Sequence, residues 1–274
     1  MKIGAISLTR VGYVDVAVDP AVLNLTADEI ERAGMISDPW VDGAGKPLVG
    51  LAAWVVESDG IVVVVDPVGA VDEFIRTGPE AITHQDAVFA AFAAAGIPRE
   101  RVDVVALTHL DGIGLTGAMT AAGTWEPAFP NARVVFTARE LEFLATAAEG
   151  DVQGLGPLRE LIAAGAVEGA ADGDELAPGV TVHVTGGHSL GHAVIRVESG
   201  GELALLIGHL ALHPLELLRD PTPTGHHDAA AAKAAVDELL AEAADRDAVV
   251  IGPLWSAPGA ARISPDRVPT PAPA

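Results

Sequence analysis

The chain has 274 residues, 50% of them hydrophobic, with a formal net charge of −22 and no cysteine. This length and apolar content are sufficient for a sizeable core, and so acidic a surface argues against nucleic acid and anionic membranes as partners. Disulfides and thiolate ligands are excluded, so any metal must be held by His, Asp or Glu.

The start of the chain, MKIGAISLTR, has too short an apolar run for a secretory signal peptide. Nowhere does an apolar stretch approach the length that crosses a bilayer. We therefore expect a cytoplasmic protein without a membrane partner.

The first predicted elements are two β-rich segments within residues 54–69, which turn at Ser58-Asp59-Gly60 as a hairpin. The second of these segments is apolar throughout, which predicts burial on both of its faces. Residues 79–97 then carry apolar residues at helical spacing, with a proline near the start and a glycine near the end.

Further along, strands and helices alternate. We predict strands at 102–107, 132–137, 180–187, 202–210 and 247–254, and helices at 138–149 and 228–244. This alternation, with no Pro/Ser-rich linker inside it, favours one α/β domain over residues 1–263. The proline-rich tail, residues 264–274, is expected to be disordered or to lie along the surface.

The histidines are the residues best suited to carry chemistry. Within three predicted strands, the segments VVAL, TVHVT and LALLIG each lead to a histidine just past their C-terminal end, namely His109, His188 and His209. In an α/β sheet these strand ends form the functional edge. Asp111, close to His109, adds a carboxylate, and the pattern therefore indicates a convergent site, with metal binding favoured over coincidence.

Other histidines have ordinary interpretations. His84 falls on a predicted helix and is expected at the surface, while His226 and His227 precede Asp228 in a polar loop, where helix capping is the usual role. His183 lies inside a predicted strand and could belong to the core or support a ligand.

Five motifs follow one another in a characteristic order: THLDGIGLTG, WEPAFPNARVVFTARELEF, TGGHSLGH, LIGHLALHP and AVVIGPL. In this order they resemble the metallo-β-lactamase superfamily, specifically its lactonase-like metallo-hydrolase branch, over nearly the whole chain. The resemblance implies an αβ/βα sandwich, in which two mixed sheets pack face to face with helices outside. It also implies a dinuclear metal site, usually zinc, at one edge between the sheets.

The family signature is H-x-H-x-D-H, followed by a histidine in G-H-T-P-G-H, a bridging aspartate and a last histidine. His109 matches the first signature histidine, and Asp111 stands where the second belongs. His188 matches the ligand of the G-H-T-P-G-H motif, and His209 replaces the bridging aspartate. These four residues are the implied metal ligands, and His109, Asp111 and His209 are also the implied catalytic residues.

The ligands that belong to the second metal alone are missing. Ile113, Gly114 and Leu254 occupy their positions and would line a pocket instead. The resemblance therefore implies at most a mononuclear site. Three imidazoles and one carboxylate suit zinc, which is favoured, and also iron or manganese. A metal-free cluster working by His/Asp acid–base chemistry stays open.

Three further residues are expected to support the ligands from behind. Asp66 would be a hydrogen-bond partner of a ligand imidazole. His192 matches the second, supporting histidine of the G-H-T-P-G-H motif, and His213 belongs to an H-P step where a packing or supporting role is favoured.

Three functions remain open. The leading hypothesis is hydrolysis of a lactone, an ester or a related small metabolite. The first alternative is a lyase, isomerase or cyclase of specialised metabolism, acting on an apolar substrate with one metal or none. The second is a non-catalytic binding protein. The aromatic residues of segment 40–54, WVDGAGKPLVGLAAW, look exposed and could contribute to a homodimer.

Overall fold

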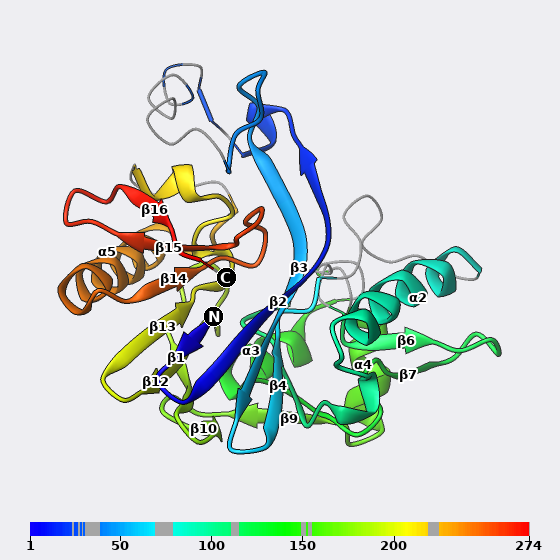
Figure 1. The fold of residues 1–274 in the computed structure, drawn as a ribbon. Helices are drawn as coiled ribbons and strands as arrows, with labels where there is room; N and C mark the ends of the chain where they lie inside the picture. Colours follow the sequence, from blue (N-terminus) through cyan, green and yellow to red (C-terminus); the bar gives the residue numbers. More distant parts are fainter. Residues whose placement is uncertain are drawn as a thin grey trace.

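The structure, a computed structural model, describes residues 1–23, 25–26, 28, 30, 39–68, 79–110, 115–148, 152, 155–218 and 225–273. Two seven-stranded sheets dominate the described part, with helices on their outer sides (Figure 1). No helix among these residues is long and apolar enough to cross a membrane.

The first sheet is mixed, because its strands run antiparallel from β1 to β4 and parallel from β4 onward. In spatial order its strands are β1 (Lys2–Ile3), β2 (Ile6–Ala17), β3 (Leu48–Ser58), β4 (Ile61–Val65), β5 (Val104–Ala106), β8 (Arg133–Thr137) and β9 (Val167–Ala170). The predicted hairpin is confirmed, since Ser58 pairs with Ile61 across a turn in which Asp59 and Gly60 both have positive φ.

The second sheet is also mixed, with one parallel pair, β13 and β14. Its strands are β10 (Glu175–Ala177), β11 (Val180–Val184), β12 (Ala193–Ser199), β13 (Glu202–Leu206), β14 (Val249–Ile251), β15 (Ala260–Ile263) and β16 (Pro269–Pro271). A separate two-stranded sheet joins β6 (Gly117–Met119) and β7 (Trp125–Pro127).

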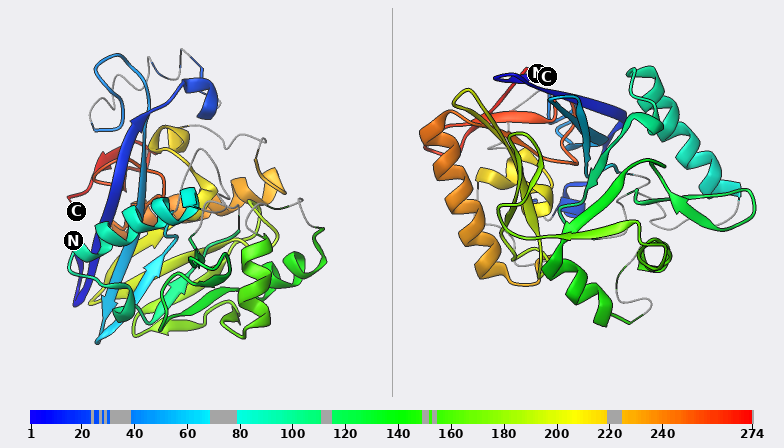
Figure 2. Two further views of the ribbon diagram at one scale, coloured as in Figure 1. Left: turned by 90° about the vertical axis from the view of Figure 1, so that its right-hand side faces the viewer. Right: turned by 90° about the horizontal axis from the view of Figure 1, so that it is seen from below.

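Helices α2 (Pro79–Ala94), α3 (Ala138–Thr146) and α4 (Leu155–Ala163) lie on the side of the first sheet, and α5 (Ala229–Arg246) covers the second (Figure 2). The short 3-10 helices are η1 (Pro20–Leu23), η3 (Arg99–Arg101), η4 (Gly208–Leu210) and η5 (Pro214–Leu218). Helix α5 begins at its N-cap Asp228, whose side chain accepts hydrogen bonds from the backbone N–H groups of Ala230 and Ala231.

Strand β4 shows how the layers are built. Val63 and Val65 face the core between the two sheets, where Ile195 and Leu206 of the second sheet also lie. Val62 and Val64 alternate with them and pack with the helices on the other side. A strand buried on both faces must be apolar throughout, as predicted. The predicted αβ/βα sandwich is confirmed.

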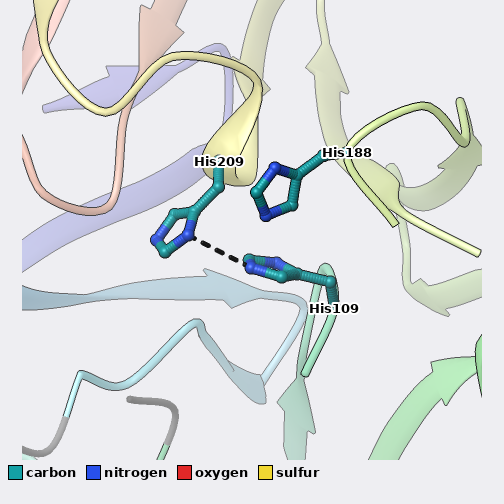
Figure 3. Close-up of side chains that lie close together, drawn as sticks. All are labelled: His109, His188 and His209. Carbon is teal, nitrogen blue, oxygen red and sulfur yellow. Dashed lines mark hydrogen bonds between the residues drawn. The ribbon is translucent and has the colours of Figure 1, made fainter. Parts of the chain in front are cut away.

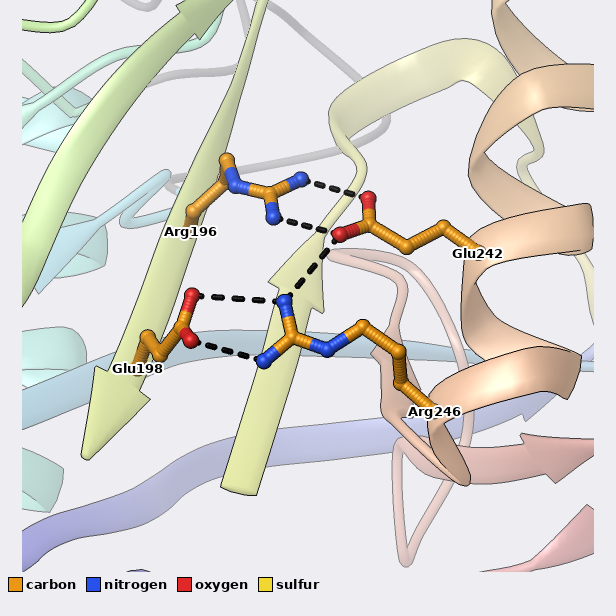
Figure 4. Close-up of polar contacts among 4 residues, drawn as sticks. All are labelled: Arg196, Glu198, Glu242 and Arg246. Carbon is orange, nitrogen blue, oxygen red and sulfur yellow. Dashed lines mark hydrogen bonds and ion pairs between the residues drawn. The ribbon is translucent and has the colours of Figure 1, made fainter. Parts of the chain in front are cut away.

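Helix α5 is held to the second sheet by a network of charges (Figure 4). Arg196 on β12 donates two hydrogen bonds to Glu242, at 2.7 and 2.6 Å, in the bidentate geometry that guanidinium and carboxylate favour. Arg246 bridges Glu242 and Glu198. The hydrogen bonds from Arg196 hold the pKa of Glu242 below its usual value.

Of the two alternatives for the proline-rich tail, disorder does not hold for residues 269–271, which pair with β15 as an edge strand, with Ala272 buried beside them. The aromatics of segment 40–54 are not exposed, because Trp40 and Trp54 are 0% and 2% accessible to solvent. They therefore offer no surface for a homodimer.

Candidate metal centre

Three imidazoles meet at one edge between the two sheets. His109 follows β5 of the first sheet, whereas His188 follows β11 and His209 lies in η4 directly after β13, both of the second sheet. One ring nitrogen of each lies within 4.8 Å of those of the other two. Figure 3 shows the three rings turned toward one another. The structure thus brings together three of the four residues expected to bind metal.

The rings are close enough to share one ion. The ring centroid of His109 lies 4.5 Å from that of His188 and 4.5 Å from that of His209. Burial, followed by the neighbouring imidazoles of His109 and His209, lowers the pKa of His188 far below its usual value. A neutral imidazole keeps the lone pair that a metal ligand requires.

A chain of hydrogen bonds fixes the proton of His109. Asp66 accepts from the backbone N–H and the Oγ1 hydroxyl of Thr108, both at 2.8 Å. Because the Thr108 hydroxyl uses its only hydrogen in the bond to Asp66, it accepts from Nδ1–H of His109 at 3.0 Å. His109 Nε2 therefore carries the lone pair, and it accepts from Nδ1 of His209 at 3.2 Å. Asp66 supports His109 through Thr108 and not directly.

Both of the other expected supporting histidines are buried. His192 Nδ1 lies 2.8 Å from the Thr185 hydroxyl, and its Nε2 is buried without a hydrogen-bond partner in the described part of the chain. The His192 ring lies 5.5 Å from that of His109, beside the cluster. Gly208 makes room for it, because a Cβ there would come within 2.5 Å of His192 Nε2.

His213 supports a loop. Its Nε2 donates to the carbonyl oxygen of Trp40 at 3.0 Å, and its Nδ1 accepts from the N–H of Leu215 at 3.2 Å. Both ring nitrogens are thus occupied by backbone groups, which fits the packing role favoured for this residue. Burial lowers the pKa of His213 to about 4.

His226 joins the cluster, although helix capping was expected for it. Its Nδ1 lies 3.2 Å from Nδ1 of His188. The backbone N–H of His227 donates to the carbonyl oxygen of His188 at 2.9 Å, so the two loops are tied together. In the sequence the only signal was a histidine pair before a helix, and nothing local connects that pair with His188.

The remaining expected site residues fall into two groups. Asp111, Ile113 and Gly114 lie outside the described residues, as does the side chain of His84. Leu254 is half-buried and packs against the small apolar cluster of Leu51 and Val68. His183 is partly exposed, and its Nδ1 lies 3.3 Å from a carboxylate oxygen of Asp172, so it belongs neither to the core nor to the cluster.

The donor set fits a divalent ion of the zinc type. Three nitrogen donors converge from different loops, His188 is held neutral by its surroundings, and the tautomer of His109 is fixed with its lone pair on Nε2. Three protein ligands that leave a coordination position open are the pattern of catalytic zinc sites. Imidazole donors also suit iron.

Comparisons with known proteins agree with this fold. The model of the metallo-beta-lactamase superfamily matches residues 49–252. No curated protein matches the chain by sequence. Among solved structures, the hydrolase AbOPH of the beta-lactamase superfamily is similar with a TM-score of 0.78 and 18% identity, covering 100% of this chain and 96% of AbOPH.

Two further structures are similar over almost their full lengths. AidC, a dizinc quorum-quenching lactonase in complex with a product, N-hexanoyl-L-homoserine, has a TM-score of 0.74 and 15% identity, covering 99% of this chain and 96% of its own. A probable metal-dependent hydrolase from Staphylococcus aureus has a TM-score of 0.70 and 15% identity, covering 98% and 96%.

The chain belongs to the metallo-beta-lactamase superfamily. Its structural neighbours include lactonases and other hydrolases of this fold. At sequence identities of 18% and below, the similarity to these neighbours shows that the fold is shared.

Proposed function

We propose that this protein is a metal-dependent hydrolase with one divalent ion, acting on the acyl carbonyl of a lactone or ester. The observation that carries this proposal is the convergence of His109, His188 and His209 within 4.8 Å. Zinc is the favoured ion, and iron and manganese are the alternatives.

The three histidines would hold the ion, with Asp111 proposed as a fourth ligand from the sequence. A bound ion of this kind polarises a carbonyl and lowers the pKa of water. The chain's own groups prepare the site for it: Asp66 and Thr108 keep the proton of His109 on Nδ1, and the buried surroundings keep His188 neutral.

The net reaction is the addition of water to an acyl carbon. The bond between this carbon and the ester oxygen breaks, and a proton from water goes to the departing oxygen. A lactone would give a hydroxy acid, and an ester an acid and an alcohol. Since AidC is a lactonase, lactones are the first substrate class to test.

The first experiment measures metal content by plasma mass spectrometry, on protein purified without a metal-affinity column. Wild type is expected to carry about one equivalent of metal, lost in His109→Ala and His188→Ala. His183→Ala is the matched control, because this histidine lies outside the cluster beside Asp172. Two equivalents in wild type would contradict a mononuclear site.

Turnover is then assayed on a panel of lactones and simple esters, with and without a chelator. Hydrolysis that the chelator abolishes and added zinc restores would support the proposal. Metal-free protein that still turns over a substrate would favour His/Asp acid–base chemistry instead. Metal binding without turnover of any lactone or ester would count against hydrolysis.

A further inference from the structure

A buried carboxylate joins two of the histidine loops. Glu140, in the first turn of α3, is only 1% exposed. Its Oε1 accepts from the backbone N–H of Leu110 at 3.3 Å. Its Oε2 accepts from the hydroxyl of Ser189 at 2.7 Å and from the N–H of Gly191 at 2.9 Å.

These donors are the immediate chain neighbours of the candidate ligands. Leu110 follows His109, in the loop after β5 of the first sheet, and Ser189 follows His188, in the loop after β11 of the second. One carboxylate therefore holds together two loops that arise from different sheets.

Thr137, the N-cap of α3, strengthens this junction. Its Oγ1 accepts from the backbone N–H of Glu140 at 3.0 Å and donates to the carbonyl oxygen of Gly191 at 2.6 Å. The N–H of Gly191 thus donates to Glu140, and its carbonyl oxygen accepts from Thr137. A Cβ at Gly191 would lie 2.2 Å from the nitrogen of Glu140, so only glycine allows the loop to approach the helix this closely.

A buried carboxylate is costly unless hydrogen bonds satisfy it. The three donors that satisfy Glu140 are neutral groups of the two histidine loops. Apolar residues at this place would leave the N–H groups of Leu110 and Gly191 and the hydroxyl of Ser189 without this acceptor. The carboxylate imposes a spacing on the groups that donate to it, because hydrogen bonds are directional and those from Ser189 and Gly191 are only 2.7 and 2.9 Å long.

We propose that Glu140 is a positioning residue, which sets the separation of His109 and His188 and thereby the affinity of the site for its metal. This inference rests on the proposed function, because it assumes that the two histidines bind one ion. Glu140 itself does not touch the ion or a substrate.

The test compares Glu140→Gln with wild type, and with Glu142→Gln as the matched control on the exposed side of the same helix. The amide of a glutamine has one acceptor oxygen, so its NH₂ group must face a donor on one of the two loops. Affinities for Zn²⁺ and Co²⁺ are expected to fall about 10- to 100-fold, as for other partners that orient ligands. Glu142→Gln is expected to bind like wild type.

Two readouts separate positioning from mere stability. The visible absorption of the Co²⁺-loaded protein reports ligand geometry, and we expect its bands to shift in Glu140→Gln while circular dichroism stays unchanged. Without any metal, amide hydrogen exchange at Leu110 and Gly191 is expected to quicken in this variant. In the same metal-free variant, the imidazole ¹⁵N resonances of His109 and His188 are expected to shift from their wild-type positions.

The outcomes distinguish the two proposals. If wild type binds neither Zn²⁺ nor Co²⁺, the proposed function fails, whereas exchange and imidazole resonances of the metal-free protein still test Glu140. If Glu140→Gln keeps wild-type affinity within about twofold and an unchanged Co²⁺ spectrum, Glu140 does not position the ligands. Should Glu140→Gln fail to fold, Ser189→Ala removes one donor only, and an unchanged metal affinity in that variant overturns the inference.

Discussion

The Nδ1 atoms of His188 and His226 lie 3.2 Å apart, so one of these rings donates a hydrogen bond to the other. Their ring planes are nearly perpendicular, at 83°. A histidine that binds metal through one nitrogen characteristically donates its other N–H to a nearby acceptor. His226 provides such an acceptor, from the loop that leads into α5.

We therefore expect His226→Ala to weaken metal binding by about tenfold, because His188 loses the partner that orients its ring. The measurement is a competition titration with a chromophoric chelator. His227→Ala is the control, since this neighbouring side chain is exposed and should bind metal normally. Equal affinities in the two variants would mean that His188 does not depend on His226.

The hydroxyl between Asp66 and His109 gives a second prediction. Thr108→Val removes the hydroxyl but keeps the shape of the side chain and the backbone hydrogen bond to Asp66. One oxygen of Asp66 then loses its donor, which is expected to destabilise the fold by about 1–3 kcal/mol. Metal affinity should also fall, by about 10- to 100-fold. Thr108→Ser retains the hydroxyl and should stay close to wild type in both titration and thermal melting.

Acid stability should depend on His213. Its pKa is lowered from 6.5 to about 4 in the folded protein, so the unfolded chain binds more protons between these values. Stability is therefore fully present above pH 6.5 and is lost as the pH falls toward about 4. The loss from this group is roughly 3 kcal/mol.

Urea unfolding of metal-free protein across this pH range measures the effect. His213→Gln is expected to be less stable at neutral pH, because it breaks the contacts with Trp40 and Leu215. Its stability should fall less steeply with acid than that of wild type. The decrease does not vanish, because burial also lowers the pKa of His188 and His192. Parallel curves for the two proteins would contradict this assignment.

The contact between Arg196 and Glu242 should contribute measurably to stability. A double-mutant cycle with Arg196→Met and Glu242→Gln is expected to give a coupling free energy of about 1 kcal/mol, the upper end for such pairs, because both hydrogen bonds are short and the side chains are mostly buried. The more exposed pair of Lys233 and Asp237 should give less, about 0.3–0.5 kcal/mol. High salt should reduce the coupling of Lys233 and Asp237 more than that of Arg196 and Glu242, because the first pair is more exposed to the screening ions. A coupling near zero for Arg196 and Glu242 would show that this pair does not help to hold α5 to the second sheet.

Metal removal should lower thermal stability, because an ion that binds only the folded state stabilises it. At a free concentration about 100 times the dissociation constant the stabilisation is about 2.7 kcal/mol. A chelator is thus expected to lower the melting temperature of wild type and to leave His109→Ala and His188→Ala unchanged. A wild-type melting temperature that changes neither with chelator nor with added zinc would argue against a metal centre.

The fold could be predicted largely from local patterns. The apolar run of β4 requires burial on both faces, and Asp228 in front of an alanine-rich segment marks the start of α5. The five ordered motifs pointed to the superfamily, and the family comparison confirms it. Helix α4 and the pair of β6 and β7 were not predicted. The segment of α4 carries buried leucines at helical spacing but is only nine residues long, and β6 and β7 have three residues each, too few to show an alternation.

For the site, the sequence by itself determined which residues were placed to meet. His109, His188 and His209 stand just past the ends of strands, and the C-terminal ends of strands in an α/β sheet form its functional edge. The packing of the two sheets brings the three rings together. That they bind metal, and that Asp111 joins them, stays a prediction.

Only the tertiary structure decided how these side chains are held. Glu140 contacts loops 30 and 49 residues away along the chain, and His226 lies 38 residues beyond His188. The same holds for Trp40, buried against Trp255, and for the tail residues that close the second sheet. Periodicity and capping follow from the backbone of a few neighbouring residues, whereas such contacts depend on how two whole sheets pack against each other.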